Sequence, residues 1–132
     1  MSERLKYILV DDDRLCNEIS TMILEDALGE VNIKAFTKPE EALEFIEREY
    51  AKNSGHTILF LDINMPKING WQFLERYDKF SEQIKLQINI YILSSSIDRA
   101  DRNKAEANKN VKGFISKPLD IEILTFISEK EF

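Results

Sequence analysis

The sequence predicts one α/β domain, in which an open parallel sheet of five strands carries helices on both faces. Short β-prone apolar runs alternate five times with segments of helical periodicity, and no separate block of strands or helices remains. One run, 58–61, is apolar throughout, as expected of a strand buried on both faces. The length of 132 residues suits one domain, 1–132, with a single core.

The first two strand and helix units are bounded by turn and capping residues. The apolar run 5–10 predicts a strand that stops at three aspartates, and apolar residues recur at helical spacing over 15–28. Gly29 predicts the end of this helix, and alternation over 31–35 predicts an edge strand with one solvated face. Thr37 and Glu40 match a capping box, with Pro39 in the first turn of a helix that extends to residue 50.

The remaining three units follow the same rhythm. The run 58–61 predicts the central strand, and a loop punctuated by Asn69-Gly70 leads to a helix around 71–77. Strands are predicted at 88–93 and 111–115, and helices at 98–108 and 120–130. Ser96 is expected to cap the helix 98–108. That helix carries no large apolar residue after Ile97, so we expect it to be weakly anchored and to move at low cost.

Composition excludes several functional classes. With 43% hydrophobic and 32% charged residues, the chain is neither disordered nor fibrous. A net charge of −6, without any run of more than two basic residues, argues against direct binding of nucleic acid. No apolar run approaches the roughly 18 residues of a membrane span. We therefore expect a cytoplasmic protein that contacts neither nucleic acid nor membrane.

Chemically active side chains follow four of the predicted strands. Asp11 and Asp12 follow the first, Asp62 the third, Ser94 the fourth and Lys117 the fifth. Ligands of such sheets bind beyond the carboxyl ends of the strands, so these residues are expected to share one rim.

Their types point to phosphoryl chemistry assisted by a cation. Two carboxylates about 4 to 6 Å apart repel by roughly 3 to 4 kcal/mol at an effective dielectric constant near 20, and Mg2+ offsets such repulsion. A hydroxyl and an ammonium group suit the charge of a transferring phosphoryl group, and a carboxylate nucleophile would form an acyl phosphate.

These motifs resemble those of response regulator receiver domains in two-component signalling. The resemblance rests on Ile8–Asp12 (ILVDD), Leu61–Pro66 (LDINMP) with Gly70, Leu93-Ser94 and Lys117-Pro118, in this order and at the ends of predicted strands. It covers nearly the whole chain and implies a flavodoxin-like (βα)5 sheet with strand order 2-1-3-4-5.

The resemblance also implies roles for the acidic residues. Asp62 would be the phosphoacceptor, Asp12 a direct ligand of Mg2+, and Asp11 a ligand largely through water. Asn64 would bind the metal through its backbone carbonyl. The phosphoryl group would come from the histidine of a histidine kinase or of a histidine phosphotransfer protein.

Further implied roles concern the switch. Ser94 and Lys117 would contact the phosphoryl oxygens, and the ring of Phe114 would follow the state of Ser94. Asn64 and Ser96, each two residues beyond a site residue, would tune hydrolysis of the acyl phosphate. The surface formed by helix 98–108, strand 111–115 and helix 120–130 would then control a downstream target protein. Ser94 and Phe114 stand where Thr and Tyr are frequent in the family, so the strength of this coupling stays open.

Other interpretations remain beside this one. Asp13 is predicted to be an ordinary helix N-cap, and Lys117-Pro118 could be an ordinary strand exit. The chain could also serve as a phosphate sink, as a relay intermediate or as a fragment of a larger regulator. A phosphohydrolase of the haloacid dehalogenase type fits less well, because it normally has a second Asp where this chain has Asn64. A flavodoxin-like cofactor binder is disfavoured because the acidic first turn would repel a flavin phosphate.

Overall fold

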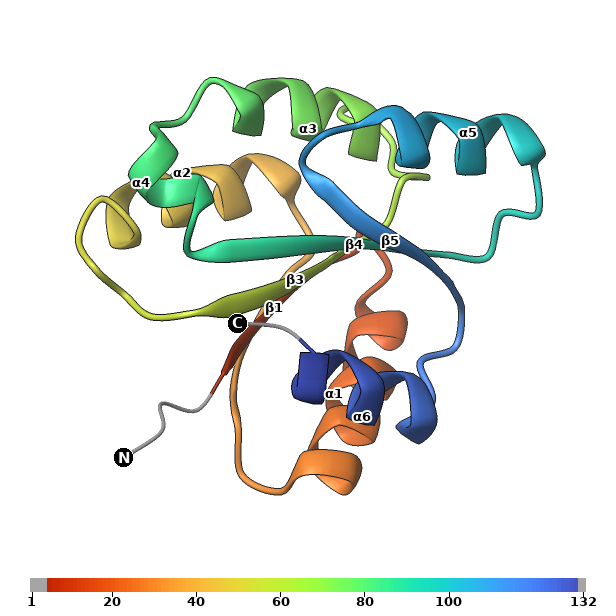
Figure 1. Cartoon of the computed structure of the whole chain (residues 1–132). Coiled ribbons are helices and arrows are strands. Elements are labelled where there is room, and N and C mark those ends of the chain that lie inside the picture. The colour runs from red at the N-terminus through yellow and green to blue at the C-terminus, as the bar shows by residue number, and fades with distance from the viewer. Residues whose placement is uncertain (1–4, 131–132) are drawn as a thin grey trace.

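A five-stranded parallel sheet forms the centre of the computed structural model, which describes residues 5–130 (Figure 1). The strands are β1 (Lys6–Val10), β2 (Asn32–Phe36), β3 (Thr57–Leu61), β4 (Ile88–Ser94) and β5 (Val111–Ser116). They pair in the order β2-β1-β3-β4-β5, and every pairing is parallel. The predicted fold class and strand order are therefore confirmed, with β2 at an edge and β3 in the centre.

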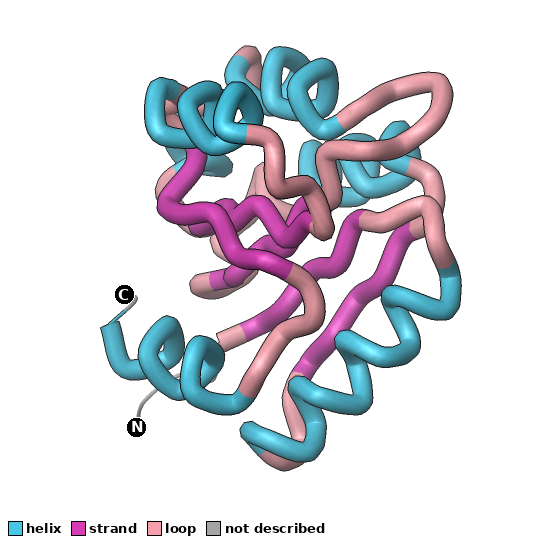
Figure 2. The backbone as a smooth tube through the Cα atoms, turned by 90° about the vertical axis from the view of Figure 1, so that its right-hand side faces the viewer, coloured by secondary structure: helices cyan, strands magenta, loops and turns pink. Residues whose placement is uncertain are grey.

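Helices cover both faces of this sheet. Helices α1 (Arg14–Leu28) and α6 (Ile121–Lys130) lie together on one face. Helices α2 (Pro39–Glu49), α3 (Gly70–Asp78), α4 (Glu82–Lys85) and α5 (Arg99–Ala107) lie on the other (Figure 1). In the side view of Figure 2 the strands run between these two helical layers. Among the described residues no helix is both long and apolar enough to span a membrane.

The sheet separates two apolar cores. Ile8, Leu59 and Ile90 face the core under α2 and α3, whereas Leu9 and Phe60 face the core under α1 and α6. Every residue of β3 is buried, because its two faces contribute to both cores. This explains the continuously apolar sequence of β3. Asp11, Asp12 and Asp62 follow β1 and β3, so they are attached to the buried centre of the fold.

Helix ends agree only in part with the sequence patterns. Asp13 caps α1 as predicted, since its side chain accepts hydrogen bonds from the backbone of Leu15 and Cys16. Gly29 ends α1 with φ 81°, also as predicted. The capping box predicted at Thr37 and Glu40 is wrong: Lys38 occupies the N-cap position of α2 and makes no side-chain capping bond. Pro39 follows it, and a proline in the first turn has no N–H that needs a cap.

Two features near β4 were not predicted. The short helix α4 has a single turn, which is too short to show a periodic pattern. Asp98, and not Ser96, caps α5: its side chain accepts from the N–H of Ala100, whereas Ser96 Oγ accepts from the N–H of Asp98 itself. Ala105 is the buried residue of α5, which agrees with the expected scarcity of apolar anchoring. The predicted output surface corresponds to α5, β5 and α6.

Candidate functional site

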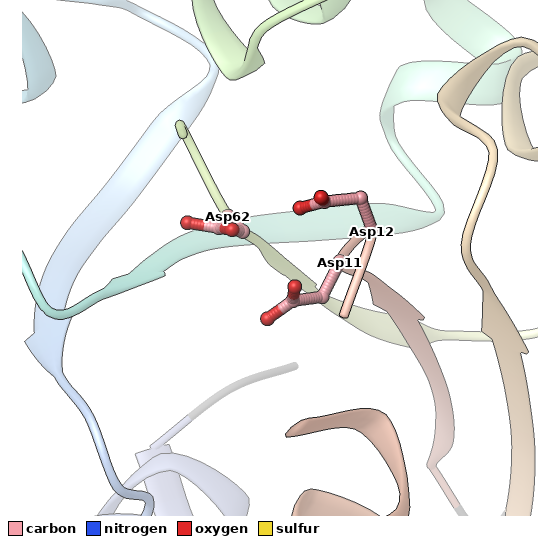
Figure 3. A group of neighbouring side chains, drawn as sticks. All are labelled: Asp11, Asp12 and Asp62. Carbon is pink, nitrogen blue, oxygen red and sulfur yellow. The ribbon is translucent and has the colours of Figure 1, made fainter. Parts of the chain in front are cut away.

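Three carboxylates meet at the carboxyl ends of β1 and β3 (Figure 3). The two strands are neighbours, and Val10 pairs with Leu61, so Asp11, Asp12 and Asp62 follow side by side. One oxygen of each carboxylate lies within 4.8 Å of one oxygen of each of the others. Asp11 and Asp62 are each 6% exposed, whereas Asp12 is exposed. The site is therefore a buried acidic pair with a third acid at its open side.

Hydrogen bonds from α1 and its cap hold the β1 end of the site. The side chain of Asn17 donates to the backbone carbonyls of Asp11 (3.0 Å) and Phe36 (3.2 Å), which ties the ends of β1 and β2 to α1. The backbone N–H of Asp13 donates to Asp11 Oδ1 at 2.9 Å. Asn17 is buried, and the sequence analysis missed it. The sequence feature that could have indicated Asn17 is its place as a polar residue in the first turn of the helix that follows the acidic motif.

The β3 end is held by the N-terminus of α3. The backbone N–H of Asn64 donates to Asp62 Oδ1 at 3.2 Å, and the N–H of Gly70 donates to the carbonyl of Ile63 at 3.1 Å. A Cβ atom at Gly70 would lie 2.7 Å from the Cα of Ile63 and 2.9 Å from the carbonyl oxygen of Asp62. Only glycine allows α3 to approach the Asp62 loop this closely. Asn64 itself is exposed.

Lys117 brings a positive charge from the far edge of the sheet. Its Nζ lies 2.6 Å from Asp11 Oδ2 and 3.8 Å from Asp62 Oδ2. Its backbone N–H donates to the carbonyl of Ser94 at 2.9 Å, which connects the ends of β4 and β5. The structure thus brings Lys117 to the carboxylates as predicted, in closest contact with Asp11.

The electrostatics of the site leave it short of positive charge. Burial, together with the charges of Asp11 and Asp12, raises the pKa of Asp62 from 3.8 to about 6, although the Asn64 N–H and Lys117 act in the opposite direction. Burial alone would lower the pKa of Lys117, but its hydrogen bond to Asp11 and the charge of Asp62 raise it. One ammonium group thus faces three carboxylates. A bound cation would relieve the repulsion that remains.

Ser94 lies at the end of β4 next to Lys117, whereas Phe114 lies further back on β5, where it pairs with Ile92. Ser94 ends β4, is fully buried, and its Oγ accepts a hydrogen bond from the N–H of Ser96 at 3.1 Å. The ring of Phe114 is half-buried against the core under α2 and α3. The guanidinium carbon of Arg102 lies 4.8 Å from the centre of that ring. Phe114 therefore lies between the core and α5.

Comparisons with known proteins agree with this geometry. The family model described as the response regulator receiver domain matches residues 7–127. A probable chemotaxis protein CheY of Rhizobium etli is 27% identical over 100% of this chain and 95% of its own length. A protein-glutamate methylesterase/protein-glutamine glutaminase of Treponema pallidum is 27% identical over 89% of this chain. The chain spans only 27% of the length of that relative.

A solved structure of a response regulator also has a similar fold. The two-component response regulator of Cytophaga hutchinsonii is 31% identical and superimposes with a TM-score of 0.88. The match covers 98% of this chain and 97% of that one. Membership of a signalling family also removes support from the phosphohydrolase considered above. The chain belongs to the response regulator receiver domain family of two-component signalling.

Proposed function

We propose that residues 1–132 act as one receiver domain in which Asp62 accepts a phosphoryl group from a phosphohistidine, with Mg2+ bound. The donor would be a histidine kinase or a histidine phosphotransfer protein. The observation that carries this proposal is the meeting of Asp11, Asp12 and Asp62 within 4.8 Å, with Lys117 in contact. Carboxylate and ammonium groups so arranged at the carboxyl ends of parallel strands suit acyl phosphate chemistry.

The residues present fit Mg2+. All three side chains offer oxygen ligands, which this hard cation prefers, and the exposed position of Asp12 leaves an open side for water and phosphoryl oxygens. When bound, Mg2+ would neutralise charge that develops on the transferring phosphoryl group. Asp11, Asp12 and Asp62 would be the residues that hold it, with the backbone carbonyl of Asn64 as a fourth donor.

The transfer itself needs only a deprotonated Asp62 and positive groups around it. An Asp62 oxygen forms a bond to phosphorus while the bond from phosphorus to the donor histidine nitrogen breaks, and the electron pair of that bond stays on the imidazole. Lys117 keeps Asp62 in its anionic form and offsets charge on the phosphoryl oxygens. The hydroxyl of Ser94 donates a hydrogen bond to one of these oxygens. The chain thus catalyses only its own phosphorylation and dephosphorylation.

An apolar strip on α1 supports a protein donor. Leu15, Ile19 and Met22 are 62%, 43% and 68% exposed, and they recur at helical spacing from the turn that carries Asp12. A helical partner that covers this strip would bring a histidine side chain next to the open side of the carboxylates. We propose that the donor binds here.

The output is a change of the surface formed by α5, β5 and α6. Once phosphorylated, the chain would draw Ser94 and Lys117 toward the phosphoryl group, and the ring of Phe114 would follow. Because α5 buries little apolar surface, a bias of a few kcal/mol would be enough to shift it. A downstream target protein would bind the shifted surface. The relay role stays an alternative, in which Asp62 returns its phosphoryl group to another histidine.

One experiment tests the acceptor residue and the transfer from a P–N bond together. The chain is incubated with Mg2+ and phosphoramidate, whose P–N bond mimics phosphohistidine, and the modified residue is located by tandem mass spectrometry after borohydride trapping. We expect the label on Asp62 alone. A label on any other residue would contradict the proposal. Adding an unphosphorylated histidine phosphotransfer protein then separates the two outputs, because a relay loses its phosphoryl group to that protein and a switch retains it.

A further inference from the structure

A chain of hydrogen bonds joins the buried hydroxyl of Ser94 to helix α5. The N–H of Ser96 donates to Ser94 Oγ at 3.1 Å, and the hydroxyl of Ser96 donates to Asp101 Oδ2 at 2.6 Å. The N–H of Asp98 donates to Ser96 Oγ at 3.2 Å. The hydroxyl of Ser96 therefore donates to one partner and accepts from another.

The direction of these bonds follows from their chemistry. An ionised carboxylate only accepts, so the hydroxyl of Ser96 must be the donor to Asp101. A donor to acceptor distance of 2.6 Å is typical of the stronger bonds made to a charged oxygen. Because Ser94 Oγ accepts from a backbone N–H, its own proton stays available for a phosphoryl oxygen. The link thus orients Ser94 without consuming its proton.

Helix α5 depends on such polar contacts. Ala105 is its buried residue, and Arg102, next to Asp101, contacts two residues of β5. Arg102 lies over the ring of Phe114 at 4.8 Å and donates to Ser116 Oγ at 3.4 Å. Two adjacent residues of α5 thereby contact the loop after β4 and the end of β5. A movement of the Ser94 loop without α5 would therefore have to break the bond between Ser96 and Asp101.

We propose that Asp101 is a positioning residue that acts through Ser96 on Ser94 and fixes the Ser94 loop to α5 in the unphosphorylated chain. The inference rests on the proposed function, because it assigns Ser94 to the phosphoryl group. Movement of Ser94 toward Asp62 must then either carry α5 along or break the bond between Ser96 and Asp101. By linkage, a partner protein that displaces α5 also changes how readily Asp62 is phosphorylated.

The first test compares rates of phosphorylation by acetyl phosphate, in which the P–O bond to acetate breaks as the bond to Asp62 forms. Asp101→Ala is expected to raise the rate roughly fivefold, the effect of losing about one net hydrogen bond that resists the movement. Asp101→Asn keeps an acceptor oxygen and should stay within about twofold of the unmodified chain, on the same scale. Ser96→Ala should match Asp101→Ala, and the double variant should be no faster than either single one. Glu106→Ala, which removes an exposed acid from the same helix, is the matched control and should have no effect.

The second test needs no phosphorylation. Amide hydrogen exchange in the unmodified proteins is expected to be faster at Ser96 and Asp98 in Asp101→Ala, but not in Asp101→Asn or Glu106→Ala. If the unmodified chain accepts no phosphoryl group, the proposed function fails, and this exchange pattern decides the positioning role alone. Equal exchange in Asp101→Ala and Asp101→Asn would overturn the inference. So would additive rates in the double variant.

Discussion

Asp62 is the residue whose environment differs most from that of a free carboxyl group. It is 6% exposed, and two other carboxylates and one ammonium group surround it. Burial and the neighbouring acids raise its pKa to about 6, so without a cation the folded chain binds a proton there more tightly than the unfolded chain does. The ionised form of Asp62 therefore lowers the free energy of unfolding of the metal-free chain.

The cost predicts a pH-dependent effect of Asp62→Asn in metal-free buffer. With a pKa near 6 in the folded chain and 3.8 in the unfolded chain, Asp62 destabilises the fold progressively as pH rises between these values. Urea unfolding should show the Asn variant to be more stable by about 3 kcal/mol at pH 7.5, with the difference shrinking toward zero near pH 4. A difference that is independent of pH would show that Asp62 is not strained by its surroundings.

At this scale the sequence predicted which charged side chains meet, but not the residues that support them. Asp11, Asp12, Asp62 and Lys117 could be predicted because each follows a strand whose position is set by its own apolar pattern. Asn17 and Asp101 could not, because their partners lie on other elements and become neighbours only in the folded chain. A sequence pattern predicts where a residue lies along its own helix, but not which side chain or carbonyl it contacts outside that helix.

The elements that hold the site are the ends of β1 and β3 and the first turn of α3. Gly70 allows α3 to contact the Asp62 loop, since a Cβ there would lie 2.7 Å from the Cα of Ile63. The overlap is with backbone, which cannot rotate away as the end of a long side chain can. The position of Asp62 therefore depends on the start of α3.

Gly70→Ala should consequently disturb both stability and the site. Overpacking of this kind costs about 1 to 3 kcal/mol, and the displaced Asp62 loop should weaken Mg2+ binding, measured by titration of the intrinsic fluorescence of Trp71. Gly29→Ala is the control. Gly29 has φ 81° at the end of α1 and nothing within 4 Å of a Cβ, so this variant should lose stability from strain while Mg2+ affinity is unchanged. Equal Mg2+ affinity in the Gly70 variant would contradict the dependence of Asp62 on α3.

The sequence predicted the order of long elements better than their ends. The five strands and the longer helices have strong apolar patterns and were found as predicted. The predicted capping box of α2 and the predicted cap of α5 were wrong, because each helix begins later in the chain than the matching pattern. Lys38 rather than Thr37, and Asp98 rather than Ser96, occupies the N-cap position.

On the scale of the whole molecule, the site exists only when the sheet is complete. Asp11 and Lys117 are 106 positions apart in the chain and meet at 2.6 Å because β1 and β5 end at the same edge of one parallel sheet, although two strands lie between them. Ligands that bind such an assembled site stabilise the entire fold, because the unfolded chain cannot hold them in the same way. Binding of Mg2+ should therefore be visible in global unfolding.

We predict that the free energy of unfolding rises with Mg2+ concentration, by about 1.4 kcal/mol per tenfold increase above the dissociation constant. Asp12→Asn should weaken Mg2+ binding, so that the same stabilisation needs a higher Mg2+ concentration. It should not lower the stability of the metal-free protein, because Asp12 is exposed and its charge repels the other two carboxylates. Asp26→Asn, at an exposed position in α1 outside the carboxylate cluster, is the control for a general loss of negative charge. If both variants respond to Mg2+ alike, the cluster is not the metal site.

The central claim is that Asp62 accepts a phosphoryl group in a reaction that needs Mg2+, and intact mass measurement tests it most directly. The chain and its Asp62→Asn variant are incubated with acetyl phosphate, with Mg2+ or with EDTA. The account predicts a gain of one phosphoryl group that is lost on mild alkaline hydrolysis, requires Mg2+ and is absent in the variant. No gain in the unmodified chain with Mg2+ bound, or an equal gain in the variant, would contradict it.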